Sequence, residues 1–345
     1  MELLEKEKYK FINGDCLNIM KQIPDGVIDC IITSPPYWAM RKYDNDSNPN
    51  EVGNEINHED YVTKLTIIFR EAKRVLSNKG SLWLNIGDKY NNKELMGMPW
   101  RVALSLMNDG WILRNDVIWN QMKGTQSCRD RLRDSYEHFF HFVKQKNYYY
   151  DADSIRVKPQ KQPKMVDGKL MSATGVSGVK YRKLISESSC LSEKEKAEAN
   201  KALDETLEQV RNGEIVDFRM TIRGVQRAWH SDNTAISGRA KELETRGYYI
   251  MKIGAKGALP TDIWNIVPED TWRKDNHCAV FPENLLRIPI LSTCPENGIV
   301  LDPFSGTGST VSAALKLGRR GVGIDLSSLY IETSIKRIHQ IGILL

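Results

Sequence analysis

Apolar and polar positions alternate in blocks along the first 155 residues, and the blocks switch between the periods typical of strands and of helices. Residues 27–33 form an apolar, β-branched run, which is typical of a buried strand. Between residues 60 and 76 apolar side chains return every three or four positions, which predicts an amphipathic helix closed at residues 78–80. Similar patterns predict strands at 81–86, 111–119 and 138–143 and a helix at 100–107. This succession predicts a mostly parallel sheet covered by helices.

The region 156–255 interrupts this rhythm. Ser192 and Glu195 form a capping box that predicts a helix ending near Arg211, after a stretch rich in glycine and serine. The alternation returns further on, with strands predicted at 298–302 and 321–325 and helices at 308–317 and 329–338. Residues 1–155 and 256–345 are therefore predicted to form one domain, and residues 156–255 an insertion into it.

Composition excludes several classes of protein. The chain has 345 residues, 41% of them hydrophobic and 27% charged, which is the composition of a globular protein with a sizeable core. Its sequence has neither a run of about 20 apolar residues nor an apolar amino-terminal stretch, so we expect a cytoplasmic protein without membrane contact. The six cysteines are scattered without a C-x-x-C pair, so we expect neither a disulfide framework nor a metal site.

The positive charge is concentrated in the insertion. Residues 156–255 hold 19 Lys and Arg against 13 Asp and Glu, whereas the rest of the chain holds 30 against 31. A basic segment between two nearly neutral flanks is typical of a nucleic-acid-binding surface. A solvated surface with an accidental imbalance is the alternative.

The first motif with chemical meaning is Asp-Pro-Phe-Ser-Gly-Thr-Gly-Ser-Thr at 302–310, between a predicted strand and a predicted helix. Gly306 and Gly308 can adopt positive φ and allow a ligand to approach the backbone. The amide groups at the start of the helix favour a carboxylate or a phosphate. Asp325 ends the next strand about 20 residues later, where a carboxylate typically binds ribose hydroxyls. A tight turn with a helix cap is the alternative.

The second motif is Thr-Ser-Pro-Pro-Tyr-Trp at 33–38, at the carboxyl end of a predicted buried strand. Open α/β sheets bind ligands at this end of their strands. The hydroxyl of Ser34, the rigid carbonyl of Pro35 and the ring of Tyr37 could hold a planar ring that bears an amino group. An ordinary Pro-Pro loop with a tyrosine in the core is the alternative.

Together, the two motifs closely resemble those of the amino-directed DNA methyltransferases that use S-adenosyl-L-methionine. The catalytic motif precedes the glycine turn here, with a basic segment between them, an order that resembles the β-class of that family. The resemblance covers nearly the whole chain outside residues 156–255. It implies a Rossmann-like class I methyltransferase fold of the α/β class, with helices on both faces of the sheet and a target-recognition region at 156–255. Further segments that resemble the family lie at 13–15, 111–119, 136–144, 146–151, 259–264 and 277–285.

The resemblance also implies the roles of particular residues. It assigns catalysis to Ser34, Pro35, Pro36 and Tyr37. It assigns cofactor binding to Asp15, Phe281, Asp302, Phe304, Ser305, Gly306, Gly308, Ser309 and Asp325. Asp325 would bind the ribose hydroxyls and Asp15 the adenine amino group, with a simple turn role as the alternative for Asp15. Asp302 would either face the cofactor or brace the glycine turn.

The reaction explains why such groups are needed. The lone pair of an exocyclic amino group is delocalised into its ring, so acceptors at Ser34 and Pro35 would bind its protons and turn the lone pair toward the methyl group. Tyr37 would stack on the ring, and catalysis would be mostly alignment. Since a duplex hides the amino group, the base would have to be flipped out.

The implied function is site-specific methylation of cytosine N4 in double-stranded DNA, in a restriction-modification, phage or orphan system. Serine before Pro-Pro-Tyr is the family's usual mark of cytosine N4 enzymes, and adenine N6 is the alternative target. A non-catalytic DNA-binding specificity module is a second alternative. The expected partners are duplex DNA and a cognate restriction endonuclease, with the protein acting as a monomer or a homodimer.

Overall fold

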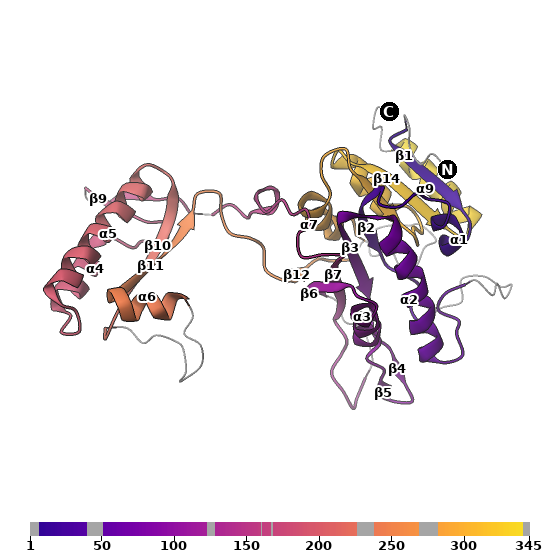
Figure 1. Ribbon diagram of the computed structural model, residues 1–345, viewed down its shortest axis with the longest axis horizontal. Helices are drawn as coiled ribbons and strands as arrows, with labels where there is room; N and C mark the ends of the chain where they lie inside the picture. Colours follow the sequence, from indigo (N-terminus) through magenta and orange to yellow (C-terminus); the bar gives the residue numbers. More distant parts are fainter. Residues whose placement is uncertain are drawn as a thin grey trace. The chain divides into compact units, whose positions relative to one another are not determined.

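The computed structural model describes residues 7–39, 51–122, 128–159, 161–166, 168–225, 238–268 and 282–340. The chain divides into two units (Figure 1). Unit 1 combines Met1–Ile155 with Thr261–Leu345, and unit 2 is Arg156–Pro260. Unit 2 thus begins at the first residue of the expected insertion and continues five residues past its expected end.

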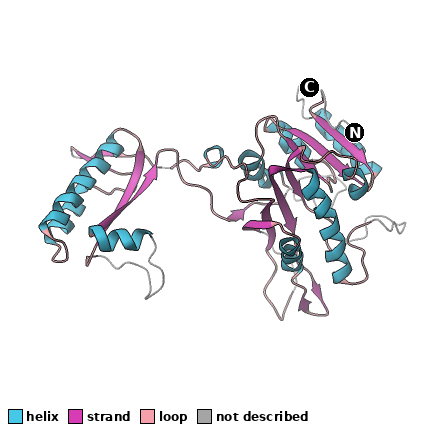
Figure 2. Cartoon of the chain, viewed as in Figure 1, coloured by secondary structure: helices cyan, strands magenta, loops and turns pink. Residues whose placement is uncertain are grey.

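Unit 1 is built on one large sheet with helices around it (Figure 2). In chain order its elements are β1 (Tyr9–Asn13), α1 (Cys16–Met20), β2 (Ile28–Thr33), α2 (His58–Val75), β3 (Leu76–Ile86), β4 (Tyr90–Asn91), β5 (Glu94–Leu95), α3 (Met98–Asn108), β6 (Ile112–Asn120), β7 (Tyr136–Val143), η1 (Asp153–Ile155), β12 (Ile263–Asn265), α7 (Glu283–Thr293), β13 (Ile299–Asp302), α8 (Ser309–Lys316), β14 (Arg320–Asp325) and α9 (Ser328–Gln340). Its strand order is β1-β14-β13-β2-β3-β7-β6-β12. Strands from the two ends of the sequence therefore lie together in the centre of one sheet.

Most neighbouring strands of this sheet are parallel, as the alternation of strands and helices predicted. The exception is β7, which is antiparallel to both β3 and β6. No helix is described between β6 and β7, and a connection without a crossover element places consecutive strands antiparallel. The sequence pattern identified both strands, but it did not determine their direction.

Successive residues of the central strands point to opposite faces, and helices cover both faces. Ile31 of β2 lies in a hydrophobic cluster with side chains of α1, α2 and α3. Its neighbours Cys30 and Ile32 lie in another cluster, with side chains of α7 and α8. The predicted α/β fold with helices on both faces is thus confirmed, and the double burial explains why β2 reads as a continuous apolar run.

The predicted end of the helix at 78–80 is wrong. The helix α2 begins after Asn57, whose side chain accepts a hydrogen bond from Asp60 N, and it ends at Val75. Leu76 is already extended and β3 follows at once. Gly80 lies within the strand, where an added Cβ would stand 2.8 Å from the carbonyl oxygen of Asp29. This glycine therefore permits close strand packing and does not cap a helix.

Unit 2 has its own hydrophobic core. Its elements are β8 (Lys164–Val166), β9 (Lys169–Met171), α4 (Gly178–Glu187), α5 (Glu193–Arg211), β10 (Ile215–Ile222), α6 (Gly238–Arg246) and β11 (Tyr248–Gly254). The strands β10 and β11 form an antiparallel ribbon, and its Phe218 and Met220 pack with Tyr181 of α4 and Leu203 of α5. The predicted capping box of α5 is confirmed, because Ser192 and Glu195 exchange hydrogen bonds between side chains and backbone.

The chain enters and leaves unit 2 through adjacent segments. Val157 and Ala258 exchange two backbone hydrogen bonds, with N–O distances of 2.8 and 3.2 Å. Gly257 permits this approach, since an added Cβ would lie 2.1 Å from the carbonyl oxygen of Val157.

Within the described ranges, no helix combines the length and the apolar character that crossing a bilayer requires.

Candidate active site

The two sequence motifs begin side by side at one edge of the large sheet. The strands β2 and β13 are parallel neighbours, with Cys30 opposite Val300, so their carboxyl ends emerge together. Thr33, the last residue of β2, donates a hydrogen bond of 2.7 Å from Oγ1 to Oδ1 of Asp302, the last residue of β13. Two loops that start 269 positions apart in the sequence therefore start within one hydrogen bond of each other.

The side chain of Asp302 braces the glycine turn, which is one of the two roles that the sequence left open, and cofactor contact by Asp302 stays a prediction. Its side chain is buried and accepts hydrogen bonds from Thr33 Oγ1, from Thr310 Oγ1 at 2.6 Å and from Phe304 N at 3.1 Å. Burial raises the pKa of Asp302 to about 6, and the hydrogen bonds from Thr310, Thr33 and Phe304 oppose this rise. The carboxylate thus ties the first turn of α8 and the loop after β13 to the end of β2.

Replacing Asp302 with asparagine should change how stability depends on pH. The pKa of Asp302 is about 6 in the folded protein against an ordinary value of 3.8, so between these pH values the folded state binds the proton more strongly than the unfolded state does. The contribution of Asp302 to the free energy of unfolding therefore falls as pH rises through this window, by about 3 kcal/mol. Asparagine does not titrate and removes this contribution. Urea unfolding of both proteins at pH 4 and pH 7 measures it, and identical pH dependence of the two would contradict it.

The glycine turn is held between β14, β1 and α9. Gly306 and Gly308 have φ of 49° and 75°, in the left-handed region that favours glycine. A Cβ on Gly308 would lie 2.9 Å from Phe11 Cζ and equally close to Ser334 Oγ. The protein's own side chains thus occupy the space that a side chain at Gly308 would fill, and cofactor binding at this glycine stays a prediction. Ser305 Oγ is buried and has no hydrogen-bond partner among the described residues.

Asp325 ends β14, and Asp15 follows two residues after the end of β1, the strand that pairs with β14. Asn13 at the end of β1 is in register with Asp325 at the end of β14. The carboxylate of Asp325 accepts hydrogen bonds from Gly306 N at 2.8 Å and Ser327 N at 2.9 Å. Oδ1 of Asp15 accepts from the backbone nitrogen of Asn18 and caps α1. Asp15 therefore has the turn role that the sequence allowed, as the N-cap of α1. Ligand binding by these two carboxylates stays a prediction.

The other predicted cofactor residues differ in their surroundings. Phe304 is partly buried and packs against the hydrophobic cluster under α1–α3. Ser309 Oγ accepts a hydrogen bond of 2.8 Å from Arg337, which also donates to Glu283 at 2.6 Å. Ser309 is thus tied to α9 and α7. Phe281 lies outside the described residues.

The loop Ser34–Tyr37 is held in place by contacts with Tyr61 and with the backbone at Gly87. The carbonyl oxygen of Pro36 accepts a hydrogen bond of 3.0 Å from the hydroxyl of Tyr61, and Pro35 is buried. A Cβ on Gly87 would stand 2.7 Å from Tyr37 Cε2, so the Tyr37 ring rests against the backbone after β3. Trp38 is buried and donates a hydrogen bond from its ring nitrogen to the carbonyl oxygen of Glu55.

The hydroxyl of Tyr37 lies in a group of polar side chains. It donates to Oε2 of Glu137 at 2.6 Å, lies 3.1 Å from Oδ1 of Asn85, and receives a hydrogen bond of 3.3 Å from Ser34 Oγ. Burial, the negative charge of Glu137 and the hydrogen bond to it raise the pKa of Tyr37 well above its ordinary value of 10.0. Tyr37 is therefore a neutral hydrogen-bond donor at neutral pH.

Sequence reasoning missed Asn85 and Glu137 as members of this group. Asn85 lies in β3, within the predicted strand 81–86. Glu137 lies in β7, one residue before the predicted start of that strand at 138, and in a segment that resembles the family. A polar residue within a strongly apolar run, such as Asn85 between Leu84 and Ile86, was the available signal. Nothing in the local pattern linked either residue to Tyr37.

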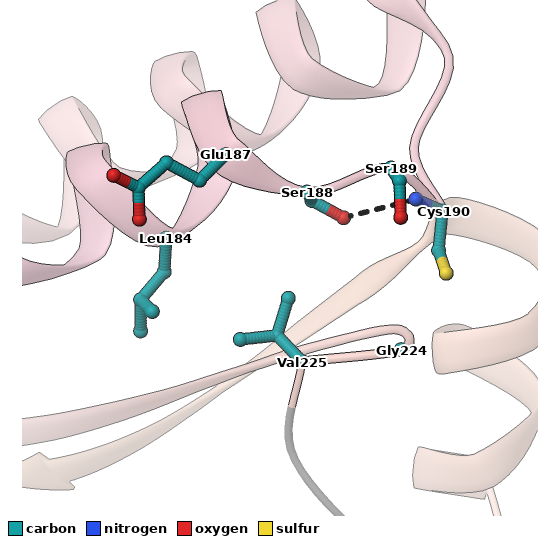
Figure 3. A pocket seen from close by; sticks show the side chains of 7 residues that line it. All are labelled: Leu184, Glu187, Ser188, Ser189, Cys190, Gly224 and Val225. Carbon is teal, nitrogen blue, oxygen red and sulfur yellow. Dashed lines mark hydrogen bonds between the residues drawn. The ribbon is translucent and has the colours of Figure 1, made fainter.

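Unit 2 contains a separate hollow of about 300 Å³ (Figure 3). Its lining consists of Leu184, Glu187, Ser188, Ser189, Cys190, Gly224 and Val225. Ser188 Oγ accepts a hydrogen bond from Cys190 N within it. The hollow contains none of the residues that the sequence motifs identified, so the strand ends of unit 1 remain the candidate active site.

Comparison with known proteins agrees with the motifs and the fold. The model of a family described as DNA methylase matches residues 28–336. M.SfiI, a type II methyltransferase of Streptomyces fimbriatus, is 31% identical over an alignment that covers 92% of this chain and 88% of M.SfiI.

Two solved structures share the fold. A PvuII DNA methyltransferase described as cytosine-N4-specific is 14% identical, with a TM-score of 0.56 over 97% of this chain and 91% of that chain. TTHA0409 of Thermus thermophilus, complexed with S-adenosyl-L-methionine, is 17% identical, with a TM-score of 0.51 over 96% of this chain and 95% of that chain.

Proposed function

Because this chain belongs to the DNA methylase family, we propose that it is a site-specific, β-class DNA methyltransferase that uses S-adenosyl-L-methionine and methylates N4 of cytosine in duplex DNA. The observation that supports this most directly is the hydrogen bond between Thr33 and Asp302. It sets the beginning of the Ser-Pro-Pro-Tyr loop beside the beginning of the glycine turn. A methyl donor and an amino acceptor must share one site, and the pairing of these two strand ends supports a shared site here.

The residues at the sheet edge fit the cofactor. Asp325 and Asp15 offer carboxylate oxygens suited to ribose hydroxyls and to the adenine amino group. The hydroxyl of Ser305, in the glycine turn, is buried and has no hydrogen-bond partner among the described residues, so it is suited to bind a polar group of the cofactor. When bound, S-adenosyl-L-methionine supplies a methyl group on a positively charged sulfur. The sulfur is a good leaving group because it departs as a neutral thioether. The protein therefore needs little acid–base chemistry and acts chiefly by alignment.

The loop Ser34–Tyr37 has the groups that a flipped cytosine requires. Ser34 Oγ and the Pro35 carbonyl accept hydrogen bonds from the two N–H groups of the amine, and Tyr37 stacks on the ring. Binding of Pro36 by Tyr61 and of Tyr37 by Glu137 fixes this loop before the base arrives. Preorganisation of this kind lowers the cost of reaching the reactive geometry.

Serine at position 34 favours cytosine N4 as the target over adenine N6. Both acceptors would serve either amine, so the choice rests on the family's usual pattern. Unit 2 is the target-recognition region, and duplex DNA is the partner. The reaction would take place in the cytoplasm, as part of a restriction-modification, phage or orphan system, and a cognate restriction endonuclease is the expected partner in the first of these.

Methylated bases identify the activity directly. We expect DNA from cells that express the wild-type chain to contain N4-methylcytosine at one short recurring sequence, because one target-recognition region reads one site. Mass spectrometry of nucleosides identifies the base, and long-read sequencing identifies the site. The Ser34→Ala variant serves as control, with a lower level of the same modification. N6-methyladenine in place of N4-methylcytosine would establish the alternative target, and unmodified DNA would establish a non-catalytic module.

A further inference from the structure

We propose that Glu137 is a positioning residue that fixes the direction of the hydrogen bonds from Ser34 through Tyr37, so that Ser34 offers lone pairs and not its proton to the target amine. The proposal rests on the methyltransferase function proposed above. It concerns a residue of β7 that belongs neither to the Ser-Pro-Pro-Tyr loop nor to the glycine turn. It starts from the contacts of the Tyr37 hydroxyl.

Two acceptors determine where the Tyr37 proton points. Glu137 Oε2 lies 2.6 Å from the Tyr37 hydroxyl, and a carboxylate only accepts. Asn85 Oδ1 lies 3.1 Å away, and the Asn85 amide is oriented by donation from its nitrogen to the carbonyl oxygen of His138. Since Tyr37 has one proton, the short contact to a charged acceptor is the stronger of the two.

The direction of the next hydrogen bond follows. With its proton committed to Glu137, the Tyr37 oxygen faces Ser34 as an acceptor, and Ser34 Oγ donates to it at 3.3 Å. The Ser34 hydroxyl has one proton and two lone pairs, so both lone pairs remain for a donor such as an amino group. If the hydrogen bonds ran in the opposite direction, the Ser34 hydroxyl would point its proton at the amine, and two hydrogen-bond donors would face each other.

Gln121 makes the isosteric substitution of Glu137 informative. Gln121 Nε2 donates to Oε1 of Glu137 at 2.8 Å. In a Glu137→Gln variant this donor would hold the new amide oxygen, which places the new amide nitrogen where Oε2 faces Tyr37. That nitrogen donates, so it would compete with Ser34 for the Tyr37 oxygen. Shape and size are kept, but the Tyr37 proton is left with Asn85 Oδ1, 3.1 Å away, as its acceptor, and Ser34 has a competitor for the Tyr37 oxygen.

Kinetics of the full-length protein with S-adenosyl-L-methionine and DNA test the proposal. We expect Glu137→Gln to lower kcat about 10-fold, with little change in KM for DNA or for the cofactor, because binding surfaces are unchanged. In a Tyr37→Phe background the same substitution should have no further effect, since the hydrogen bonds through the Tyr37 hydroxyl are already absent. Glu332→Gln, at an exposed position of α9, is the matched control and should equal the wild type.

A second measurement does not depend on activity. With 3-fluorotyrosine in place of tyrosine, the ¹⁹F resonance of Tyr37 is identified by its loss in Tyr37→Phe. We expect it to shift in Glu137→Gln and to stay in place in Glu332→Gln.

The outcomes separate this proposal from the function on which it rests. Wild-type transfer with unchanged kcat in Glu137→Gln would overturn the positioning role and leave the methyltransferase intact. Additive effects of Glu137→Gln and Tyr37→Phe would overturn it as well, because Glu137 would then act independently of Tyr37. A wild-type protein that methylates no DNA would overturn both.

Discussion

Replacing Tyr37 with alanine is expected to lower the rate of methyl transfer to DNA by about 100-fold, because a base without its stacking partner is poorly aligned with the methyl donor. The ring of Tyr37 rests against Gly87, and its hydroxyl is anchored by Glu137, so it is a fixed surface before the base arrives. The loss should appear in kcat measured with tritiated cofactor at saturating DNA.

Two controls locate the effect of this substitution. Tyr37→Phe keeps the ring and should retain more activity than Tyr37→Ala. Cofactor affinity, measured by calorimetry, should be unchanged in both variants, since Asp325 and Asp15 lie at or just after the ends of other strands. If Tyr37→Ala transferred methyl groups at the wild-type rate, the base-binding site would have to lie elsewhere.

Excising unit 2 is expected to abolish site-specific DNA binding while unit 1 keeps its fold and its affinity for the cofactor. Unit 2 has its own hydrophobic core, and the paired Val157 and Ala258 bring its two ends together, so a short glycine-rich linker can join Ile155 to Thr261. Residues 156–260 hold 20 Lys and Arg against 13 Asp and Glu, and this excess of positive charge suits a DNA backbone.

The expected loss of affinity for the cognate site is about 1,000-fold or more, the usual gap between specific and non-specific binding. Fluorescence anisotropy with a labelled duplex that contains the mapped site measures it at fixed salt. Calorimetry with S-adenosyl-L-methionine on the same variant confirms that unit 1 is intact. A truncated protein that binds the cognate duplex as tightly as the full chain would show that recognition does not reside in unit 2.

The elements that could be predicted from the sequence, such as β2 and α5, have apolar patterns or capping signals that are local. The strand β2 is buried on both faces and therefore reads as one apolar run, and the capping box of Ser192 and Glu195 is complete within four residues. The prediction failed where local signals conflict. Gly80 resembles a helix end, yet it serves the packing of β3 against Asp29.

The two loops of the candidate site were also visible in the sequence. Proline restricts the backbone and glycine allows it more conformations. Ser-Pro-Pro-Tyr and the glycine turn can therefore be identified from a few neighbouring residues without tertiary context. The roles of individual side chains did not follow. Asp302 and Asp15 both offered two interpretations, and their hydrogen bonds to Thr33, Thr310 and Asn18 showed what each carboxylate contacts within the protein.

By itself, then, the sequence determined part of the strands and helices, the insertion and the two chemical motifs, because each of these depends on residues that are neighbours in the chain. Only the tertiary structure decided which strand ends meet, that β7 reverses direction, and that Glu137 and Asn85 lie behind Tyr37. These contacts join residues 48 to 269 positions apart, and the pairing of strands that brings them together leaves no periodic signal in any one segment.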